Sequence, residues 1–182
     1  MKEISLNVLD LAENSLRAKA TKVEIDISVQ GNLLCLTIAD NGCGMDEDFV
    51  KRVTDPFATT RTTRNVGLGI PLAKMEAEMS GGSFSVQSKT GVGTTVTATF
   101  AVDHIDRPPL GNLGDTIVAL IPDLGDAELI FRYKAFGEEF VLDTNEIRQQ
   151  LQDVPMDSPE VLVFLRQLVQ ENITTINGGI IL

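Results

Sequence analysis

Two glycine-rich segments could let the backbone approach a bound ligand closely. The first, Asp40-Asn41-Gly42-Cys43-Gly44-Met45, follows a strand-like run, and the second, Gly67-Leu68-Gly69, begins a helical pattern. A helix N-terminus carries free N–H groups and the positive end of the helix dipole, which suit an anion such as a phosphate. Each segment alone is weak evidence, because Gly-x-Gly is also common in ordinary turns and helix starts.

A third candidate is a polar stripe on the first predicted helix, residues 2–20. Apolar side chains gather on one side of its helical wheel, whereas Asp10, Asn14 and Arg17 follow one another at one-turn spacing on the other. The stripe combines a carboxylate, an amide and a guanidinium, but polar stripes are more often solvated helix faces. The helix alone leaves both interpretations open.

The elements that must position these residues follow from the hydrophobic periodicity. Alternation over 21–40, with Gly31-Asn32 between its halves, predicts a β-hairpin that ends at Asp40. A short helix is expected over 46–53, and residues 54–66, rich in Thr and Arg and without clear periodicity, are interpreted as a mobile lid. A helix from Gly67 to Gly81 and two strands, 84–88 and 96–102, complete the unit.

The order of these features resembles the Bergerat-fold ATPases, the superfamily of DNA gyrase, heat-shock chaperones, histidine kinases and MutL. The polar helix, a hairpin ending in Asp-x-Gly-x-Gly, the lid, the Gly-Leu-Gly helix start and a Gly-Thr-Thr strand follow one another over residues 3–102. The resemblance implies an α+β fold, a two-layer sandwich whose mixed, mainly antiparallel sheet is covered by helices on one face. It also implies that the protein binds ATP with Mg²⁺.

The resemblance assigns roles at the adenine end of the site. Asp40 is expected to accept a hydrogen bond from the adenine amino group, and Gly42 and Gly44 are expected to let the backbone turn closely beside the base. An ordinary turn-capping Asp is the alternative for Asp40. The remaining nucleotide contacts expected by resemblance in the hairpin end, the lid and the last strand are Met45, Phe57 and Thr95.

The resemblance also assigns the phosphate end. Asn14 is expected to coordinate Mg²⁺ through its side-chain oxygen, and Arg17 stands where histidine kinases usually carry a lysine, which favours the kinase branch. The N–H groups of Gly67, Leu68 and Gly69 are expected to face the phosphates. The lid residues Arg61 and Arg64 could add charge-assisted hydrogen bonds or could be solvated loop charges.

The catalytic residue expected by resemblance is Asp10. Gyrase-like members carry a glutamate four residues before the magnesium asparagine, and this chain has the shorter aspartate there. Asp10 could act as a base through a repositioned water, or only orient a magnesium-bound water. A second departure is Asn65-Val66, where kinases often have Gly-Thr, and this puts the expected closure of the lid in doubt.

The composition narrows the partners. A formal net charge of −11 and a pI near 4.5 argue against nucleic acid and anionic membranes, and no apolar run reaches the ~18 residues of a membrane helix. Two cysteines and one histidine do not form a zinc or disulfide pattern. We therefore expect a cytoplasmic protein whose partners are ATP and other proteins.

Past residue 102 the pattern changes, so we predict three parts: an ATP-binding domain over 1–102, a linker over 103–110 and a small α+β module over 111–182. The module is expected to contain a helix over 115–121, a hairpin over 128–142 that turns near Gly137, a helix after Asp143 and a last helix over about 158–172. Its apolar pattern is interpreted as a small core of its own. Its hairpin could extend the sheet of the first domain, and its last helix could form a homodimer.

Two functions compete. A self-contained sensor kinase carries its phosphoacceptor histidine on a dimerising hairpin before the nucleotide domain, whereas this chain starts almost at the nucleotide-binding helix, and His104 lies in the predicted linker. The first hypothesis is therefore a stand-alone ATPase or protein kinase that acts in trans; the second is a non-catalytic, ATP-gated switch or regulatory subunit. A dinucleotide-binding enzyme is disfavoured, because a hairpin, not a βαβ unit, leads to the Asp40 loop.

Overall fold

The computed structural model describes residues 3–54, 68–180 and 182, whose strands form one six-stranded sheet. In chain order the strands are β1 (Lys22–Gln30), β2 (Leu33–Asp40), β3 (Phe84–Lys89), β4 (Gly93–Ala101), β5 (Glu128–Ala135) and β6 (Glu138–Asp143). Their spatial order is β3-β4-β2-β1-β5-β6, and all neighbours are antiparallel except β1 and β5. The expected mixed, mainly antiparallel sheet is confirmed.

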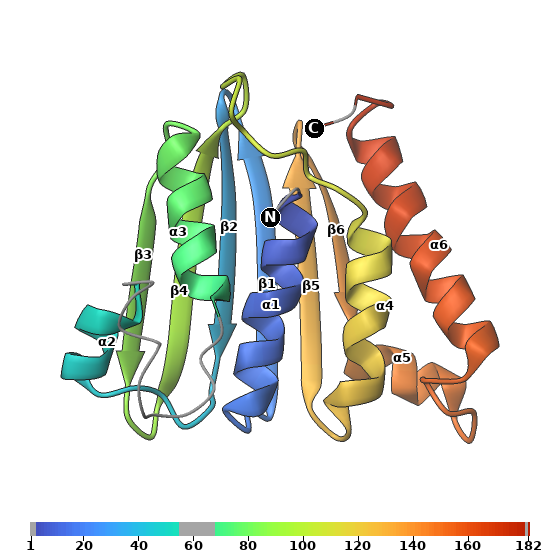
Figure 1. Cartoon of the computed structure of the whole chain (residues 1–182). Coiled ribbons are helices and arrows are strands. Elements are labelled where there is room, and N and C mark those ends of the chain that lie inside the picture. Colours follow the sequence, from blue (N-terminus) through green and yellow to red (C-terminus); the bar gives the residue numbers. More distant parts are fainter. Residues whose placement is uncertain (1–2, 55–67, 181) are drawn as a thin grey trace.

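Helices cover one face of this sheet, as Figure 1 shows. They are α1 (Ile4–Arg17), α2 (Glu47–Val53), α3 (Gly69–Met79), α4 (Leu113–Leu124), α5 (Thr144–Leu151) and α6 (Pro159–Ile176). In the order α3, α1, α4 and α6, four of them lie side by side across the sheet. The two-layer α+β sandwich expected from the resemblance is therefore confirmed.

Helix α1 is shorter than the predicted 2–20 because the chain turns after Arg17. Lys19 has a left-handed φ of 59°, which ends the helix and directs the chain into β1. Ile4, Val8 and Leu11 are buried toward the sheet, as the apolar periodicity predicts. The hairpin that follows is also confirmed, with Gly31 at a φ of 57° in its turn.

The C-terminal segment extends the same sheet, so the expectation of a separate small core is wrong. Strand β5 pairs in parallel with β1, and Phe131 and Tyr133 are buried in the same hydrophobic cluster as Ile25 of β1. Without β5, the outer edge of β1 would leave unpaired N–H and C=O groups, which explains why the hairpin adds to the sheet. The proposed boundaries at 102 and 110 remain a prediction.

The predicted C-terminal elements are present with shifted ends. The hairpin turns at Gly137, with a φ of 86°, and α5 begins after Asp143, whose side chain accepts a hydrogen bond from the N–H of Asn145. Helix α4 begins earlier than expected because the side chain of Asn112 caps it, accepting a hydrogen bond from the N–H of Asp115. Within the described residues, no helix is long and apolar enough to cross a membrane.

Candidate nucleotide site

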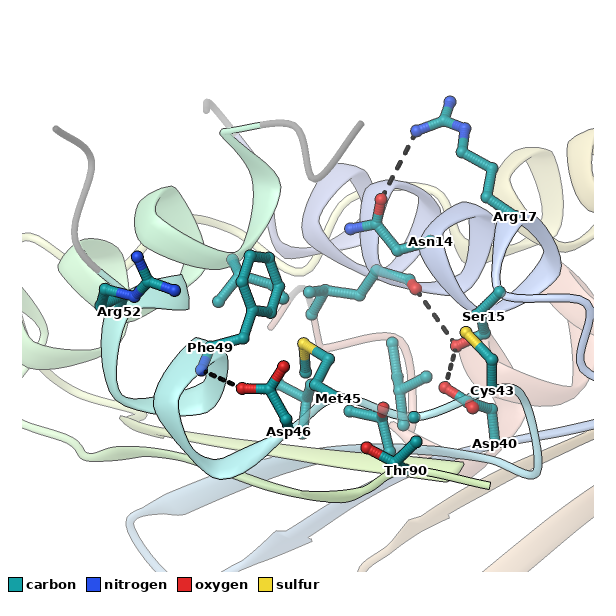
Figure 2. A pocket seen from close by; sticks show the side chains of 17 residues that line it. Asn14, Ser15, Arg17, Asp40, Cys43, Met45, Asp46, Phe49, Arg52 and Thr90 are labelled. Carbon is teal, nitrogen blue, oxygen red and sulfur yellow. Dashed lines mark hydrogen bonds between the residues drawn. The ribbon is translucent and has the colours of Figure 1, made fainter. Parts of the chain in front are cut away.

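A cavity of about 560 Å³ lies where α1 and α2 meet the ends of β2 and β4 (Figure 2). This volume is in the range of small-molecule sites. Its apolar lining comes from five different elements and the loop after β2: Leu11, Ile38, Met45, Phe49, Ile70 and Val96. Such a lining suits a flat aromatic group, and the polar side chains are grouped at defined places around it.

Asp40, at the end of β2, is held by two donors. Its Oδ2 accepts a hydrogen bond from the Ser15 hydroxyl at 2.8 Å, and its Oδ1 accepts one from the N–H of Gly42 at 2.8 Å. A carboxylate can accept about four hydrogen bonds, so Asp40 keeps free acceptor capacity in the cavity that it lines. The side chain is therefore oriented to accept a further hydrogen bond, such as one from an amino group.

The two glycines after Asp40 occupy positions where a side chain would not fit. A Cβ on Gly42 would lie 2.8 Å from the carbonyl oxygen of Ala18. Gly44 has a φ of 64°, and a Cβ there would overlap the carbonyl oxygen of Lys89. Their predicted role of close backbone turning is consistent with this packing, although only Gly44 lines the cavity.

Asn14 and Arg17 line the cavity from α1, and Figure 2 shows them at the same side. The Arg17 guanidinium donates to the Asn14 side-chain oxygen at 3.4 Å and to the Glu13 carboxylate at 2.6 Å. Half of the Arg17 side chain is exposed, so this pair with Glu13 is weak and can be rearranged. The predicted magnesium residue and the predicted phosphate residue are thus adjacent and solvent-accessible.

Asp10 lies one turn before Asn14 and does not line the cavity. It packs against the start of α3, where a Cβ on Gly69 would lie 3.0 Å from the Asp10 Cβ. Burial raises the pKa of Asp10, and the charge of Arg17 opposes this shift. Leu68 precedes α3 as its N-cap and is largely exposed, and neither Leu68 nor Gly69 lines the cavity.

Thr95 is a further predicted contact that lies outside the lining of this cavity. Thr95 does not line the cavity, whereas Thr94 and Val96 do. Alternate side chains of a strand point to opposite faces, so Thr94 shares the face of the buried Val96, and Thr95 points to the other face of the sheet. The Thr94 hydroxyl also contacts the Ser88 hydroxyl at 2.8 Å, and Ser88 accepts a hydrogen bond from the N–H of Met45.

Sequence reasoning missed other residues of the cavity. Ser15 is buried in the same row of α1 as Leu11 and Ala12, and a serine in an apolar row is a signal that could identify it. Cys43, Phe49 and Arg52 also line the cavity, and Figure 2 shows Phe49 and Arg52 on the side opposite Asp40. The remaining predicted residues, Phe57, Arg61, Arg64 and Gly67, and the Asn65-Val66 pair, lie outside the described residues.

A metal ion would depend on the nucleotide for most of its ligands. Among residues 3–54, 68–180 and 182, no three His, Cys, Asp or Glu side chains are grouped to hold one. Magnesium keeps several water and phosphate ligands and needs few from the protein. The single side-chain oxygen of Asn14 in the cavity is compatible with such a site.

His104 lies at the opposite end of the sheet from Asp40. Thr94 pairs with Asp40 at one end of β4, and Ala101 pairs with Leu33 at the other. Seven residue steps at about 3.3 Å each separate these pairs by roughly 23 Å, and His104 follows Ala101. The His104 Nδ1 accepts a hydrogen bond from the N–H of Asp106 at 3.1 Å. Direct transfer from the cavity to His104 of the same chain would therefore require a large rearrangement.

Comparison with known proteins agrees with this geometry. The family described as histidine kinase-, DNA gyrase B- and HSP90-like ATPases matches residues 2–104, more than half of the chain, so the chain belongs to this family. This family relationship supports ATP binding and an ATPase domain of the histidine-kinase type. The residues matched include α1, the Asp40 loop and β4.

Histidine kinases are among the similar proteins. The chain is 31% identical over 113 residues to the signal transduction histidine-protein kinase AtoS of Escherichia coli. The aligned region covers 62% of this chain and 17% of that protein. It is 36% identical over 86 residues to a sensor-like histidine kinase of Rhizobium meliloti, covering 44% and 16%. It is 24% identical over 146 residues to the histidine protein kinase DivJ of Caulobacter vibrioides, covering 63% and 24%. The chain thus spans a quarter or less of these relatives.

Proposed function

We propose that this protein binds ATP with Mg²⁺ and acts in trans, as an ATPase or protein kinase, on a partner protein. The observation that carries the proposal is Asp40, whose two oxygens are held by Ser15 and Gly42 within an apolar cavity. Adenine offers an amino group to such an acceptor and an aromatic face to the apolar lining. The residues present therefore fit an adenine nucleotide.

The roles of the chain's own residues follow from their positions. Asn14 would hold the metal, and Arg17 would exchange its weak contacts with Asn14 and Glu13 for charge-assisted hydrogen bonds to phosphate. Bound magnesium would neutralise negative charge on the phosphates. Asp10, one turn away, would orient a water molecule or accept its proton. Met45, Phe49 and Ile70 would exclude water from the base.

Transfer to another protein is supported by the position of His104 and by the charge of the C-terminal segment. His104 lies roughly 23 Å along the sheet from the cavity, by the strand spacing given above. Residues 103–182 contain 14 of the 26 acidic side chains and only 5 of the 15 basic ones, and α6 exposes Val163 and Phe164. An excess of negative charge in a segment that also exposes apolar side chains favours a basic protein partner. A cytoplasmic location and a homodimer remain predictions.

A non-catalytic, ATP-gated switch is the second candidate, and Asp10 favours it. Aspartate is one methylene shorter than the glutamate expected for gyrase-like catalysis, and Asp10 packs against Gly69 and does not line the cavity. A site of this kind can bind nucleotide without efficient turnover. Binding would then change the conformation that a partner recognises.

Nucleotide binding and turnover are measured separately to test these proposals. Wild type should bind ATP in calorimetry, and magnesium should strengthen binding, whereas Asn14→Ala should lose the magnesium effect. The enzyme proposal expects release or transfer of the labelled γ-phosphate in the presence of co-purified proteins, and Asp10→Ala should remove it. Wild type that binds ATP but shows neither reaction would contradict the enzyme proposal. If ATP then leaves limited proteolysis of the chain unchanged, the switch fails as well.

A further inference from the structure

The loop after β2 is held between the end of α1 and the turn that joins β3 to β4. On one side, the Cys43 N–H donates a hydrogen bond of 2.9 Å to the carbonyl oxygen of Ala18. On the other side, the N–H of Gly91 donates to the Cys43 carbonyl oxygen at 2.8 Å. There too, the Met45 N–H donates to the Ser88 hydroxyl at 2.8 Å. The loop is therefore fixed from two sides.

Ser88 contributes the side chain in this arrangement, whereas the other two hydrogen bonds join backbone groups. It lies near the end of β3 on the half-buried face of that strand. Its hydroxyl also donates to the Gly93 carbonyl oxygen at 2.9 Å and contacts the Thr94 hydroxyl at 2.8 Å. These two contacts to β4 orient the hydroxyl oxygen, which accepts the Met45 N–H. A substitution of Ser88 can therefore remove one specific anchor of the loop.

Met45 directly precedes Asp46, the N-cap of α2, and α2 has little other support at its start. The Asp46 side chain accepts a hydrogen bond from the Phe49 N–H at 2.7 Å, which closes the first turn of the helix. Phe49 packs against the hydrophobic core while half-exposed, and only Val53, at the far end of α2, is buried. A helix of two turns is marginal by itself, so its place depends on contacts around it. The Met45 contact with Ser88 fixes where α2 begins.

This segment carries one wall of the cavity. Met45, Phe49 and Arg52 line it, and Figure 2 shows Phe49 and Arg52 on the side opposite Asp40. Asp40 has its own support, because Ser15 donates a hydrogen bond to its carboxylate. The spacing between these two walls therefore depends on how firmly the start of α2 is held. A flat base that packs between them needs that spacing to be constant.

We propose that Ser88 is a positioning residue that anchors Met45 and the start of α2, and so fixes the cavity wall opposite Asp40. The inference rests on the proposed function, because this wall is expected to pack against the base of ATP. Ser88 does not line the cavity itself, so it acts through Met45. A wall that is held in place before the nucleotide arrives does not have to be ordered on binding. Loss of the hydroxyl should weaken binding although no nucleotide contact is removed.

The expected magnesium site does not depend on Ser88. Asn14 and Arg17 belong to α1, and the hydrogen bonds that the structure shows for them do not involve Ser88. Loosening the start of α2 should therefore affect the base more than the metal. The expected signature is an equal loss of affinity for ATP and for adenosine, with the effect of magnesium on ATP binding retained.

Ser88→Thr and Ser88→Val form a matched pair. Threonine and valine have nearly the same shape and both suit a strand, whereas only threonine keeps the hydroxyl. Ser85→Val, at an exposed position of the same strand, serves as the control. The measurements are calorimetric affinity for ATP and for adenosine, thermal unfolding, and amide exchange without nucleotide. Exchange is followed at Met45, at Val50 in α2 and at Ala98 in β4.

Ser88→Val should bind ATP and adenosine about tenfold more weakly, by factors that agree within about twofold, because one hydrogen bond is lost. Ser88→Thr and Ser85→Val should bind both as wild type does. The Met45 and Val50 amides should exchange about tenfold faster in Ser88→Val, since the anchor before α2 is missing. Ala98 should exchange as in wild type, and all variants should keep a cooperative thermal transition.

Equal affinities of Ser88→Val and Ser88→Thr, or wild-type exchange of Met45 in Ser88→Val, would overturn the inference. So would faster exchange of Ala98 or loss of the cooperative transition in Ser88→Val, because Ser88 would then support the whole sheet and not this wall. Exchange is measured without nucleotide, so that result is independent of the proposed function. The proposed function fails instead if wild type does not bind ATP.

Discussion

The hydroxyl group of Ser15 donates a hydrogen bond of 2.8 Å to Asp40, which is 25 residues further along the chain. This contact joins α1 to the end of β2 and holds the Asp40 carboxylate in the cavity. It connects the helix that carries Asn14 with the strand that carries the expected base acceptor. Nucleotide affinity should therefore depend on Ser15 as well as on Asp40.

Ser15→Ala should weaken ATP binding about tenfold, because a hydrogen bond to a charged group contributes about 1.5 kcal/mol or more. Asp40→Asn should weaken it further, since an amide can turn an N–H group toward the adenine amino group. Fluorescence competition with ATP measures both. Ser85→Ala, an exposed serine of β3, is the control and should bind as wild type. Equal affinities for Ser15→Ala and Ser85→Ala would contradict the role of Ser15.

Replacing either of two neighbouring threonines of β4 by alanine should change ATP affinity by different amounts. Thr94→Ala should weaken ATP binding by roughly 1 kcal/mol, because Thr94 lines the cavity and contacts Ser88, which holds the N–H of Met45. Thr95→Ala should leave binding unchanged, since Thr95 lies on the opposite face of the strand. The two variants are matched in residue type and partial burial, and calorimetry measures both. The reverse order of effects would restore Thr95 to the site.

The rate of ATP turnover should rise with pH in the acidic range, and the rise should follow the ionisation of Asp10. Burial raises the pKa of Asp10 above its ordinary value of 3.8, with Arg17 opposing the shift. Only the ionised carboxylate can accept a proton, so activity should rise with pH through the raised pKa. Asp10→Asn should lose most of the turnover and should also lose this dependence on acidic pH. If the same rise persists in Asp10→Asn, the titrating group is another residue.

Ionisation of the same Asp10 carboxyl group should lower the folding stability as pH rises, whereas it should raise the activity. Because its folded-state pKa is raised, the folded protein holds more protons than the unfolded chain between pH 3.8 and the raised value. The contribution of Asp10 to stability should therefore decrease as pH rises through this window. The stability difference between wild type and Asp10→Asn, measured by urea unfolding across acidic pH, should change with pH within this window and become constant well below pH 3.8.

Arg132 should stabilise the junction between β1 and β5. Its guanidinium donates hydrogen bonds to Asp26 at 3.0 Å and to Glu24 at 3.1 Å, across the parallel pair of strands. All three side chains are partly exposed, so Arg132→Met should cost only about 1 kcal/mol at neutral pH. Urea unfolding measures the change, with Lys134→Met, an exposed residue of the same strand, as the control.

The Arg132 contribution should also depend on pH. Burial acts to raise the pKa of Glu24, but hydrogen bonds and charges from Arg132 and Lys22 outweigh it and lower the pKa below the ordinary 4.5. Stability from this contact is present above about pH 4.5 and is lost as pH falls through the lowered value. The difference between wild type and Arg132→Met should therefore shrink in acid. A constant difference would contradict the proposed cause.

A fragment of residues 1–104 should fold poorly by itself, although the family match ends there. The fragment lacks β5, so the edge of β1 would be exposed, and it lacks α4, so the side of α1 that α4 covers would be exposed. We expect low solubility and no cooperative thermal transition. Circular dichroism and calorimetry of the fragment measure this. A cooperative transition would instead support the predicted boundary at residue 102.

The local elements could be predicted because their signals lie within a few residues. Alternation over residues 21–40 predicted the hairpin, and Asp40 was placed at a strand end next to two glycines that the fold requires at that position. Thr95, expected by resemblance, lies outside the cavity lining, whereas its neighbour Thr94 is part of it. A family motif marks a segment of the strand, whereas the position of the strand in the sheet decides which of its side chains faces the cavity.

The sequence by itself determined the amphipathic faces, the turns and the residue types that an ATP site needs, since these depend on neighbours in the chain. Only the tertiary structure decided that Ser15 meets Asp40, that Asn7 meets Glu76 and that β5 completes the edge of β1. Periodicity shows that a face is buried but does not show what buries it. Contacts between residues 25, 69 or more than 100 positions apart depend on how the elements pack, which no local pattern encodes.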